Sequence, residues 1–94
     1  MFTFKDFPKL SGRDLQKVLR DTDFDVIAKA VCGEENRQVF IAVAPVMSRR
    51  AAKMLRTKIT ENGEIAKDEV LRCQNSMLKK ANELAENGDI TLVE

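Results

Sequence analysis

The sequence predicts an all-α fold, a single compact bundle of about six helices spanning residues 1–94. Three observations favour this class. Apolar residues recur at helical spacing in successive segments. Capping residues precede these segments, and isolated glycines follow them. A strand-like run at residues 34–43 has no evident neighbour to satisfy its backbone groups, because only residues 90–93 offer a second such run.

The composition is that of one folded domain. Hydrophobic residues make up 44% of the chain and charged residues 33%, which is the balance of a globular protein. Sixteen Lys and Arg residues against fifteen Asp and Glu residues give a net charge of +1, so no overall field attracts nucleic acid or anionic lipid. The start has no signal-peptide pattern, and the longest apolar run, residues 39–46, is too short to span a bilayer. We therefore expect no membrane insertion and a cytoplasmic location.

The amino-terminal segments predict short helices. A short first helix is expected within residues 1–10. Ser11 followed by Asp14 is a capping-box signal, so a second helix starts there and ends near Thr22. Its apolar face consists of Leu15, Val18 and Leu19.

The next helix is expected to follow directly. Thr22 and Asp25 form another possible capping box, and Gly33 suits the left-handed C′ position at the end. Its apolar face consists of Ile27, Ala28 and Val31. Residues 34–43 are ambiguous by local propensity, because β-branched residues are frequent there, and we predict a helix that Pro45 ends.

Two longer helices complete the prediction. Ser48 is a good N-cap for a helix over residues 47–62, which Gly63 ends. Its apolar stripe consists of Ala51, Ala52, Leu55 and Ile59. The longest helix covers residues 68–87, with Gly88 at C′ and an extended tail over residues 89–94. Its inward residues are Val70, Gln74, Met77, Leu78, Ala81, Leu84 and Ala85.

Residues that carry catalysis are scarce. Histidine is absent, which removes the commonest general base and metal ligand. Cys32 and Cys73 fit no metal spacing or disulfide framework and are expected to be small semi-buried apolar residues in a reducing compartment. The serines are interpreted as caps or exposed helix residues, and the glycines are isolated, so no phosphate loop exists. We expect no enzyme activity, cofactor or metal.

The helix over residues 47–62 is unusually basic, with five Lys or Arg residues against Glu61 alone. Arg49, Lys53 and Arg56 share one face of it, with Arg50 beside them and opposite the apolar stripe. A solvated face that only keeps the domain soluble would explain these charges. That is the usual explanation for a generic basic helix, but crowding of like charges costs some helix stability, which is evidence for a partner. If there is a partner, an acidic protein fits better than nucleic acid, because no aromatic residue is interleaved and the domain as a whole is not basic.

Several short motifs occur in order along the chain, among them Met1-Phe2-Thr3-Phe4 at its start and Met47-Ser48-Arg49-Arg50-Ala51-Ala52 at the basic helix. Together they resemble the C-terminal domain of FliG, the flagellar motor switch family, whose hinge motif Met-Phe-x-Phe is similar to residues 1–4. Arg13-Asp14-Leu15-Gln16-Lys17-Val18-Leu19-Arg20-Asp21-Thr22-Asp23 is similar to Asp-Arg-Ser-Ile-Gln-x-Leu-Leu-Arg-Glu-Val-Asp. Met47-Ser48-Arg49-Arg50-Ala51-Ala52 is similar to Met-Ser-x-Arg-Ala-Ala, which opens the family's torque helix. Further matches are Gln74, Leu84, Gly88, Asp89 and Ile90.

The resemblance implies a helical rotor subdomain in the flagellar basal body, at the cytoplasmic face of the inner membrane. Its torque helix would contact the cytoplasmic loop of the stator subunit MotA and convert ion flow into rotation; other switch-complex proteins would be partners within a longer chain. The protein-binding residues expected on this helix are Arg50, Thr57 and Lys58 from the resemblance, together with Arg49, Lys53 and Arg56 from the basic face. The implied hinge residues are Met1, Phe2 and Phe4.

The sequence departs from the family at charged positions. Arg50 matches the torque-helix arginine, but Thr57 and Lys58 stand where the family has two adjacent aspartates. Cys32 replaces a lysine and Ala66 an arginine. A helix of one sign favours an acidic counterpart. The alternative to a motor role is therefore a repurposed adaptor that binds an acidic protein, and nucleic-acid binding through the basic helix is a third hypothesis. Without the family's amino-terminal and middle regions, these residues are not expected to form a complete rotor protein.

Overall fold

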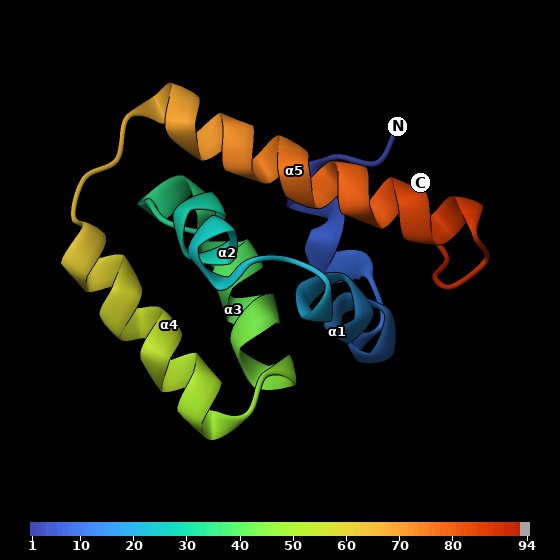
Figure 1. The fold of residues 1–94 in the computed structure, drawn as a ribbon, viewed down its shortest axis with the longest axis horizontal. Helices are drawn as coiled ribbons and strands as arrows, with labels where there is room; N and C mark the ends of the chain where they lie inside the picture. Colours follow the sequence, from blue (N-terminus) through green and yellow to red (C-terminus); the bar gives the residue numbers. More distant parts are fainter. Residues whose placement is uncertain (93–94) are drawn as a thin grey trace.

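The structure is a computed structural model that describes residues 1–92, and in that range every regular element is helical (Figure 1). The α-helices are α1 (Gly12–Arg20), α2 (Phe24–Ala30), α3 (Arg37–Val43), α4 (Arg49–Asn62) and α5 (Lys67–Glu86). The 3-10 segments are η1 (Phe4–Lys9), η2 (Glu34–Asn36) and η3 (Ala44–Val46). The predicted all-α class is therefore confirmed.

Helix α1 begins where the sequence predicts. The Ser11 hydroxyl accepts a hydrogen bond of 3.1 Å from the Asp14 N–H, which is an N-cap. The predicted capping box is only half formed, because the Asp14 carboxylate accepts from the Thr91 N–H at 3.2 Å. Lys17 Nζ also donates to the Asp89 carbonyl at 2.9 Å, so α1 anchors the chain after α5. The tail prediction for residues 93–94 lies outside the described residues.

The predicted boundaries of the next helix need two corrections. Asp23, and not Thr22, caps α2, since its Oδ1 accepts from the Asp25 N–H at 2.8 Å. The Thr22 hydroxyl donates to the Val18 carbonyl at 2.7 Å and so closes the end of α1. Gly33 does have a positive φ of 91°, but α2 has its C-cap at Val31, which places Gly33 one residue beyond C′.

The stretch over residues 34–43 is helical, as predicted. It consists of the single turn η2 followed by α3, which turns Val39 and Val43 into the core. The chain before it is held by Asn36, a buried polar residue whose Nδ2 donates to the Cys32 carbonyl at 2.7 Å. A buried amide is retained at little cost in stability when it is hydrogen-bonded.

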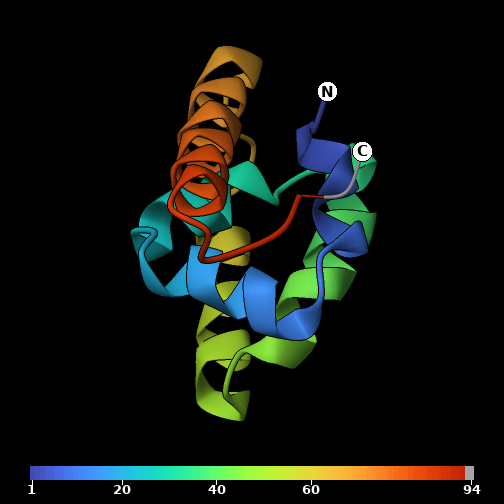
Figure 2. The same ribbon diagram turned by 90° about the vertical axis from the view of Figure 1, so that its right-hand side faces the viewer.

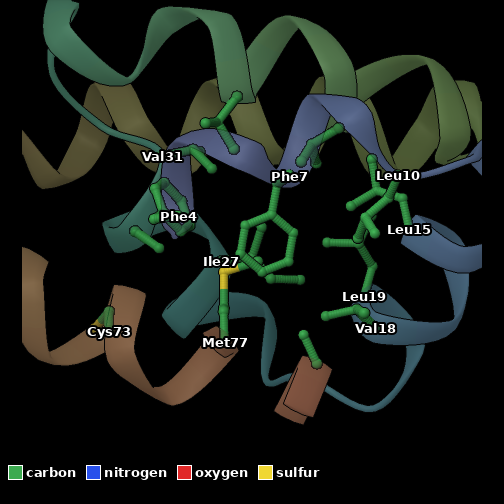
Figure 3. Packing of buried hydrophobic residues seen from close by; sticks show 14 of the residues in the cluster. Phe4, Phe7, Leu10, Leu15, Val18, Leu19, Ile27, Val31, Cys73 and Met77 are labelled. Atoms are coloured by element: carbon green, nitrogen blue, oxygen red, sulfur yellow. The ribbon is translucent and has the colours of Figure 1, made fainter. Parts of the chain in front are cut away.

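An aromatic cluster lies at the centre of the core. Phe7 is fully buried, and its ring meets those of Phe2 and Phe4 edge to face, with centroids 5.3 Å and 5.2 Å away. Figure 3 shows the Phe7 ring in the middle of side chains from the surrounding helices, with Ile27 and Met77 nearby. This cluster joins η1, which packs against α3 and α5, to the helices of the bundle.

A hydrogen-bonded turn opens η1. The Asp6 carboxylate accepts from the Thr3 backbone N–H at 2.8 Å and from the Thr3 hydroxyl at 3.1 Å. The bond from the Thr3 backbone, followed by the one from Lys9, lowers the pKa of Asp6. Thr3 and Asp6 have the same spacing as Ser11 and Asp14, so the sequence carried this signal too.

Helices α4 and α5 take different places in the bundle. Helix α5 packs along α2 and also reaches α1 and η1, whereas α4 packs mainly on α2 and on η3. Figures 1 and 2 show α4 at the end of the domain away from the N-terminus. At the end of α5, Gly88 has a φ of 79°, and the Asp89 N–H donates to the Leu84 carbonyl at 2.8 Å, which confirms the predicted C′ glycine.

Candidate functional site

Helix α4 carries the predicted protein-binding residues, and local sequence signals fix its ends. The Ser48 hydroxyl accepts from the Ala51 N–H at 3.1 Å and caps the helix, as predicted. Gly63 ends it with a φ of 61°, a conformation that a residue with a Cβ rarely adopts. The helix spans Arg49–Asn62, close to the predicted residues 47–62.

Replacing Ser48 with alanine is expected to lower the free energy of unfolding by about 1 kcal/mol, because the Ala51 N–H loses its capping acceptor. Urea denaturation followed by circular dichroism measures this loss. Ser76→Ala is the matched control, since Ser76 lies exposed within α5, and no loss is expected there. Equal midpoints for the two variants would show that the cap contributes nothing.

The faces of α4 differ in burial. Ala52 and Leu55 are buried against the bundle, and Ile59 is half-buried beside them. At 3.6 residues per turn, the side of α4 opposite these residues carries Arg50, Lys53, Thr57 and Glu61, and we call the first three of them the outer ridge. All three residues of the outer ridge are exposed.

The remaining predicted residues lie on the flanks of α4 and do not share the outer ridge. Arg49 and Arg56 lie on the side toward α3, where the Arg56 guanidinium carbon is 5.8 Å from the centroid of the Phe40 ring. Lys58 lies on the opposite side, where its Nζ is 3.2 Å from the Asp25 carboxylate of α2. Lys58 is half-buried, and its charge is directed at α2.

The cations of the outer ridge have no internal partner within residues 1–92. No carboxylate in this range lies within 4.0 Å of Arg50 or Lys53, and the same is true of Arg49 and Arg56. The Thr57 hydroxyl donates to the Lys53 carbonyl at 3.1 Å, so it is satisfied within the helix. The two charges of the outer ridge are thus positive, and the carboxylate of Glu61 lies on the same side of α4 one turn beyond Thr57.

An apolar hollow adjoins the outer ridge. It encloses about 380 Å³ between α2 and α4, with Phe24 and Met54 as its large apolar residues. The side chain of Met54 is 53% exposed, which is high for a large apolar residue. Charged groups of Asp25, Lys58 and Glu61 surround the hollow. An apolar centre with a charged rim is typical of protein interfaces.

The predicted hinge residues lie apart from α4. Phe2 and Phe4 are buried in the aromatic cluster with Phe7, and Met1 is exposed. Because η1 packs against α3 and α5, the structure does not bring the hinge motif together with the outer ridge. Sequence analysis also missed Asp25 and Phe40 as partners of α4, since Asp25 was interpreted as part of a capping box and Phe40 was given no role.

The two cysteine thiols are more deeply buried than expected. Burial raises the pKa of both, and the nearby carboxylates of Glu35 and Glu69 raise it further at Cys32 and Cys73 respectively. The Cys32 thiol also donates to the Lys29 carbonyl at 3.0 Å. These surroundings disfavour the reactive thiolate. Among the described residues, no group of three or more His, Cys, Asp or Glu side chains is placed to hold a metal ion.

The fold and this surface define a small all-helical domain that presents a basic helix at one end. The chain belongs to the FliG C-terminal domain family, whose model matches residues 1–92. This confirms the resemblance found in the sequence motifs. No described helix is long and apolar enough to cross a bilayer.

Relatives and solved structures agree with this assignment. The chain is 34% identical over 92 residues to the flagellar motor switch protein FliG of Pseudomonas aeruginosa, covering 98% of this chain and 27% of that protein. It is 31% identical to the protein of the same name from Aquifex aeolicus, over 98% of this chain and 28% of the other. The chain thus spans about a quarter of the length of these curated relatives.

The structural match extends over nearly the whole chain. The crystal structure of FliG residues 116–343 from H. pylori matches with a TM-score of 0.92 at 24% identity, over 97% of this chain and 40% of that one. Full-length FliG from Aquifex aeolicus matches with a TM-score of 0.81 at 29% identity, over 94% of this chain and 27% of that one. Both support the predicted helical fold.

Proposed function

We propose that this chain is the stator-facing subdomain of a flagellar rotor and that the outer ridge of α4 contacts the cytoplasmic loop of the stator subunit MotA. The observation that carries the proposal is the unpaired basic charge of Arg50 and Lys53 on an exposed helix of the FliG C-terminal fold. The proposed role is mechanical and not catalytic, and its place is the cytoplasmic side of the inner membrane. Other switch-complex proteins are further partners of the same rotor.

The sign of the outer ridge identifies the chemistry of the partner. Arg50 and Lys53 project into solvent, and Thr57 contributes no charge. With a net charge of +1 the whole chain provides little long-range attraction, so the contact depends on local pairing with carboxylates. Surface charges are screened beyond about 8 Å at physiological salt, so added salt should weaken the contact. Phe24 and Met54 add an apolar area that favours a protein partner over nucleic acid.

Reversing both charges, Arg50→Glu with Lys53→Glu, is expected to weaken binding to the stator loop at least roughly tenfold, because attraction to carboxylates becomes repulsion. The measurement is an NMR titration of the labelled chain with the loop peptide, following the amides of α4. The fold should be unaffected, since both side chains are exposed.

The matched control is Lys79→Glu with Arg13→Glu, which makes the same change in net charge at exposed residues of α5 and α1. No ion pair holds either residue within residues 1–92. Equal weakening by both double variants would mean that net charge, and not α4, governs binding. Unchanged affinity in the α4 variant would contradict the proposed site.

The adaptor hypothesis has one specific observation in its favour. Lys58 stands where the family has an aspartate, and its pairing with Asp25 at 3.2 Å uses this position to hold α4 on α2. A wild-type chain that gives no shifts with the loop at millimolar concentration, and whose deletion leaves motility intact, would be such an adaptor. Tight, salt-sensitive binding to a DNA duplex would instead revive the nucleic-acid hypothesis.

A further inference from the structure

A furrow runs along the flank of α4 that faces α3 and η3, away from the outer ridge. It consists of two hollows of about 390 Å³ and 290 Å³. Phe40 and Ile59 supply apolar surface in the larger hollow, and Pro45 and Met47 do so in the smaller one. Arg56 lines both hollows, so its side chain borders each of them.

The charges along this furrow are predominantly positive. Arg37 and Arg56 line the larger hollow, and Arg49 and Arg56 line the smaller one. Glu34 supplies the carboxylate among the lining residues, and it lies 3.4 Å from Arg37. Both side chains of this ion pair are exposed, so the pair is weak and a carboxylate of a ligand can replace Glu34 beside Arg37. The furrow therefore has apolar side chains on its floor and an excess of arginine along its rim.

The contact with Phe40 distinguishes Arg56 from an arginine that is surrounded by solvent alone. The guanidinium carbon is 5.8 Å from the centroid of the half-buried ring, which is within cation–π range. This contact favours a position of the guanidinium over the ring and leaves its N–H groups available for hydrogen bonds. A carboxylate that approaches there can accept two parallel hydrogen bonds.

We propose that the furrow between α3 and α4 binds an acidic, amphipathic segment of a partner protein, which places an apolar side chain beside Phe40 and Ile59 and a carboxylate on Arg56. Charge complementarity selects this occupant, because the rim carries Arg37, Arg49 and Arg56 against Glu34. The apolar floor distinguishes it from a purely phosphate-binding surface. Phe40 is the one aromatic residue among the lining residues, whereas single-stranded nucleic acid stacks successive bases on several rings. The furrow does not include Arg50 or Lys53, so the inference stands independently of the stator contact.

The test uses the whole chain and a synthetic peptide in which leucine and glutamate follow helical spacing. NMR titration should shift the amides near Phe40, Arg56 and Thr60, and a peptide with glutamine for every glutamate should bind at least roughly tenfold more weakly. Arg56→Gln should weaken binding of the acidic peptide by a similar factor. Arg56→Lys should retain only part of the affinity for the acidic peptide, because lysine keeps the charge but not the bidentate geometry.

Two controls separate the furrow from its surroundings. Arg13→Gln with Lys79→Gln should change the Kd of the peptide less than about threefold, since these exposed residues of α1 and α5 lie outside both the furrow and the outer ridge. Phe40→Leu keeps most of the core volume while removing the ring under Arg56, and it should weaken binding as Arg56→Lys does. Shifts confined to Arg50 and Lys53, a flat titration, or tighter binding to a DNA duplex than to the peptide would overturn the proposal.

Discussion

Replacing Phe7 with alanine is expected to lower the free energy of unfolding by about 3–5 kcal/mol. The Phe7 side chain is 0% exposed, and its ring packs edge to face on Phe2 at 5.3 Å and on Phe4 at 5.2 Å. Its removal deprives both rings of their shared neighbour and leaves a cavity between η1 and the bundle. Urea denaturation of the variant, followed by circular dichroism, measures the loss.

Phe24→Ala is the matched control for this prediction, because Phe24 lies half-buried at the surface of α2. The same chemical change there should lower the free energy of unfolding much less. A total stability of about 5–15 kcal/mol is usual for a domain, so Phe7→Leu provides a smaller, graded loss if Phe7→Ala does not fold. Similar losses for Phe7→Ala and Phe24→Ala would contradict the central place of Phe7 in the core.

The helices could be predicted from the sequence because their end signals are local. Ser11, Ser48 and Gly88 each act within one turn of their own helix, and each is found in its predicted role. The cap of α2 could not be fixed in this way, since Thr22 and Asp23 are adjacent and both are good caps. Asp23 is the cap because the Thr22 hydroxyl is already used at the end of α1, where it donates to the Val18 carbonyl.

In the candidate site, too, the positions that depend on local sequence could be predicted, and those that depend on tertiary packing could not. Helical periodicity is sufficient to place Arg50 and Lys53 opposite the buried face of α4. The surroundings of Arg56 and Lys58 depend on which helices lie beside α4, and their partners are distant in sequence. A helical wheel of α4 alone therefore groups basic residues together, whereas in the fold these residues lie on an outer ridge and on two flanks with different neighbours.

Replacing Leu55 with alanine is expected to lower the free energy of unfolding by about 2–5 kcal/mol, and to do so by loosening α4 in particular. Leu55 is 0% exposed, and the other buried residue of α4 is the small Ala52 at 8%. Because α4 packs mainly on α2 and η3, it has few other apolar contacts to hold it. Amide hydrogen exchange should therefore accelerate in α4 more than in α5, in addition to the lower urea midpoint.

Leu71→Ala is the control, since Leu71 is 47% exposed on α5 and its removal should change stability by less than about 0.5 kcal/mol.

The comparison with charge reversal connects packing to function. Arg50→Glu with Lys53→Glu should lose stator binding at normal stability, whereas Leu55→Ala should weaken binding only as far as the open state of α4 becomes a substantial fraction of the chain. If exchange in α4 stayed slow after Leu55→Ala, the Lys58 to Asp25 ion pair and the Arg56 to Phe40 contact would hold the helix, and its position would depend on salt.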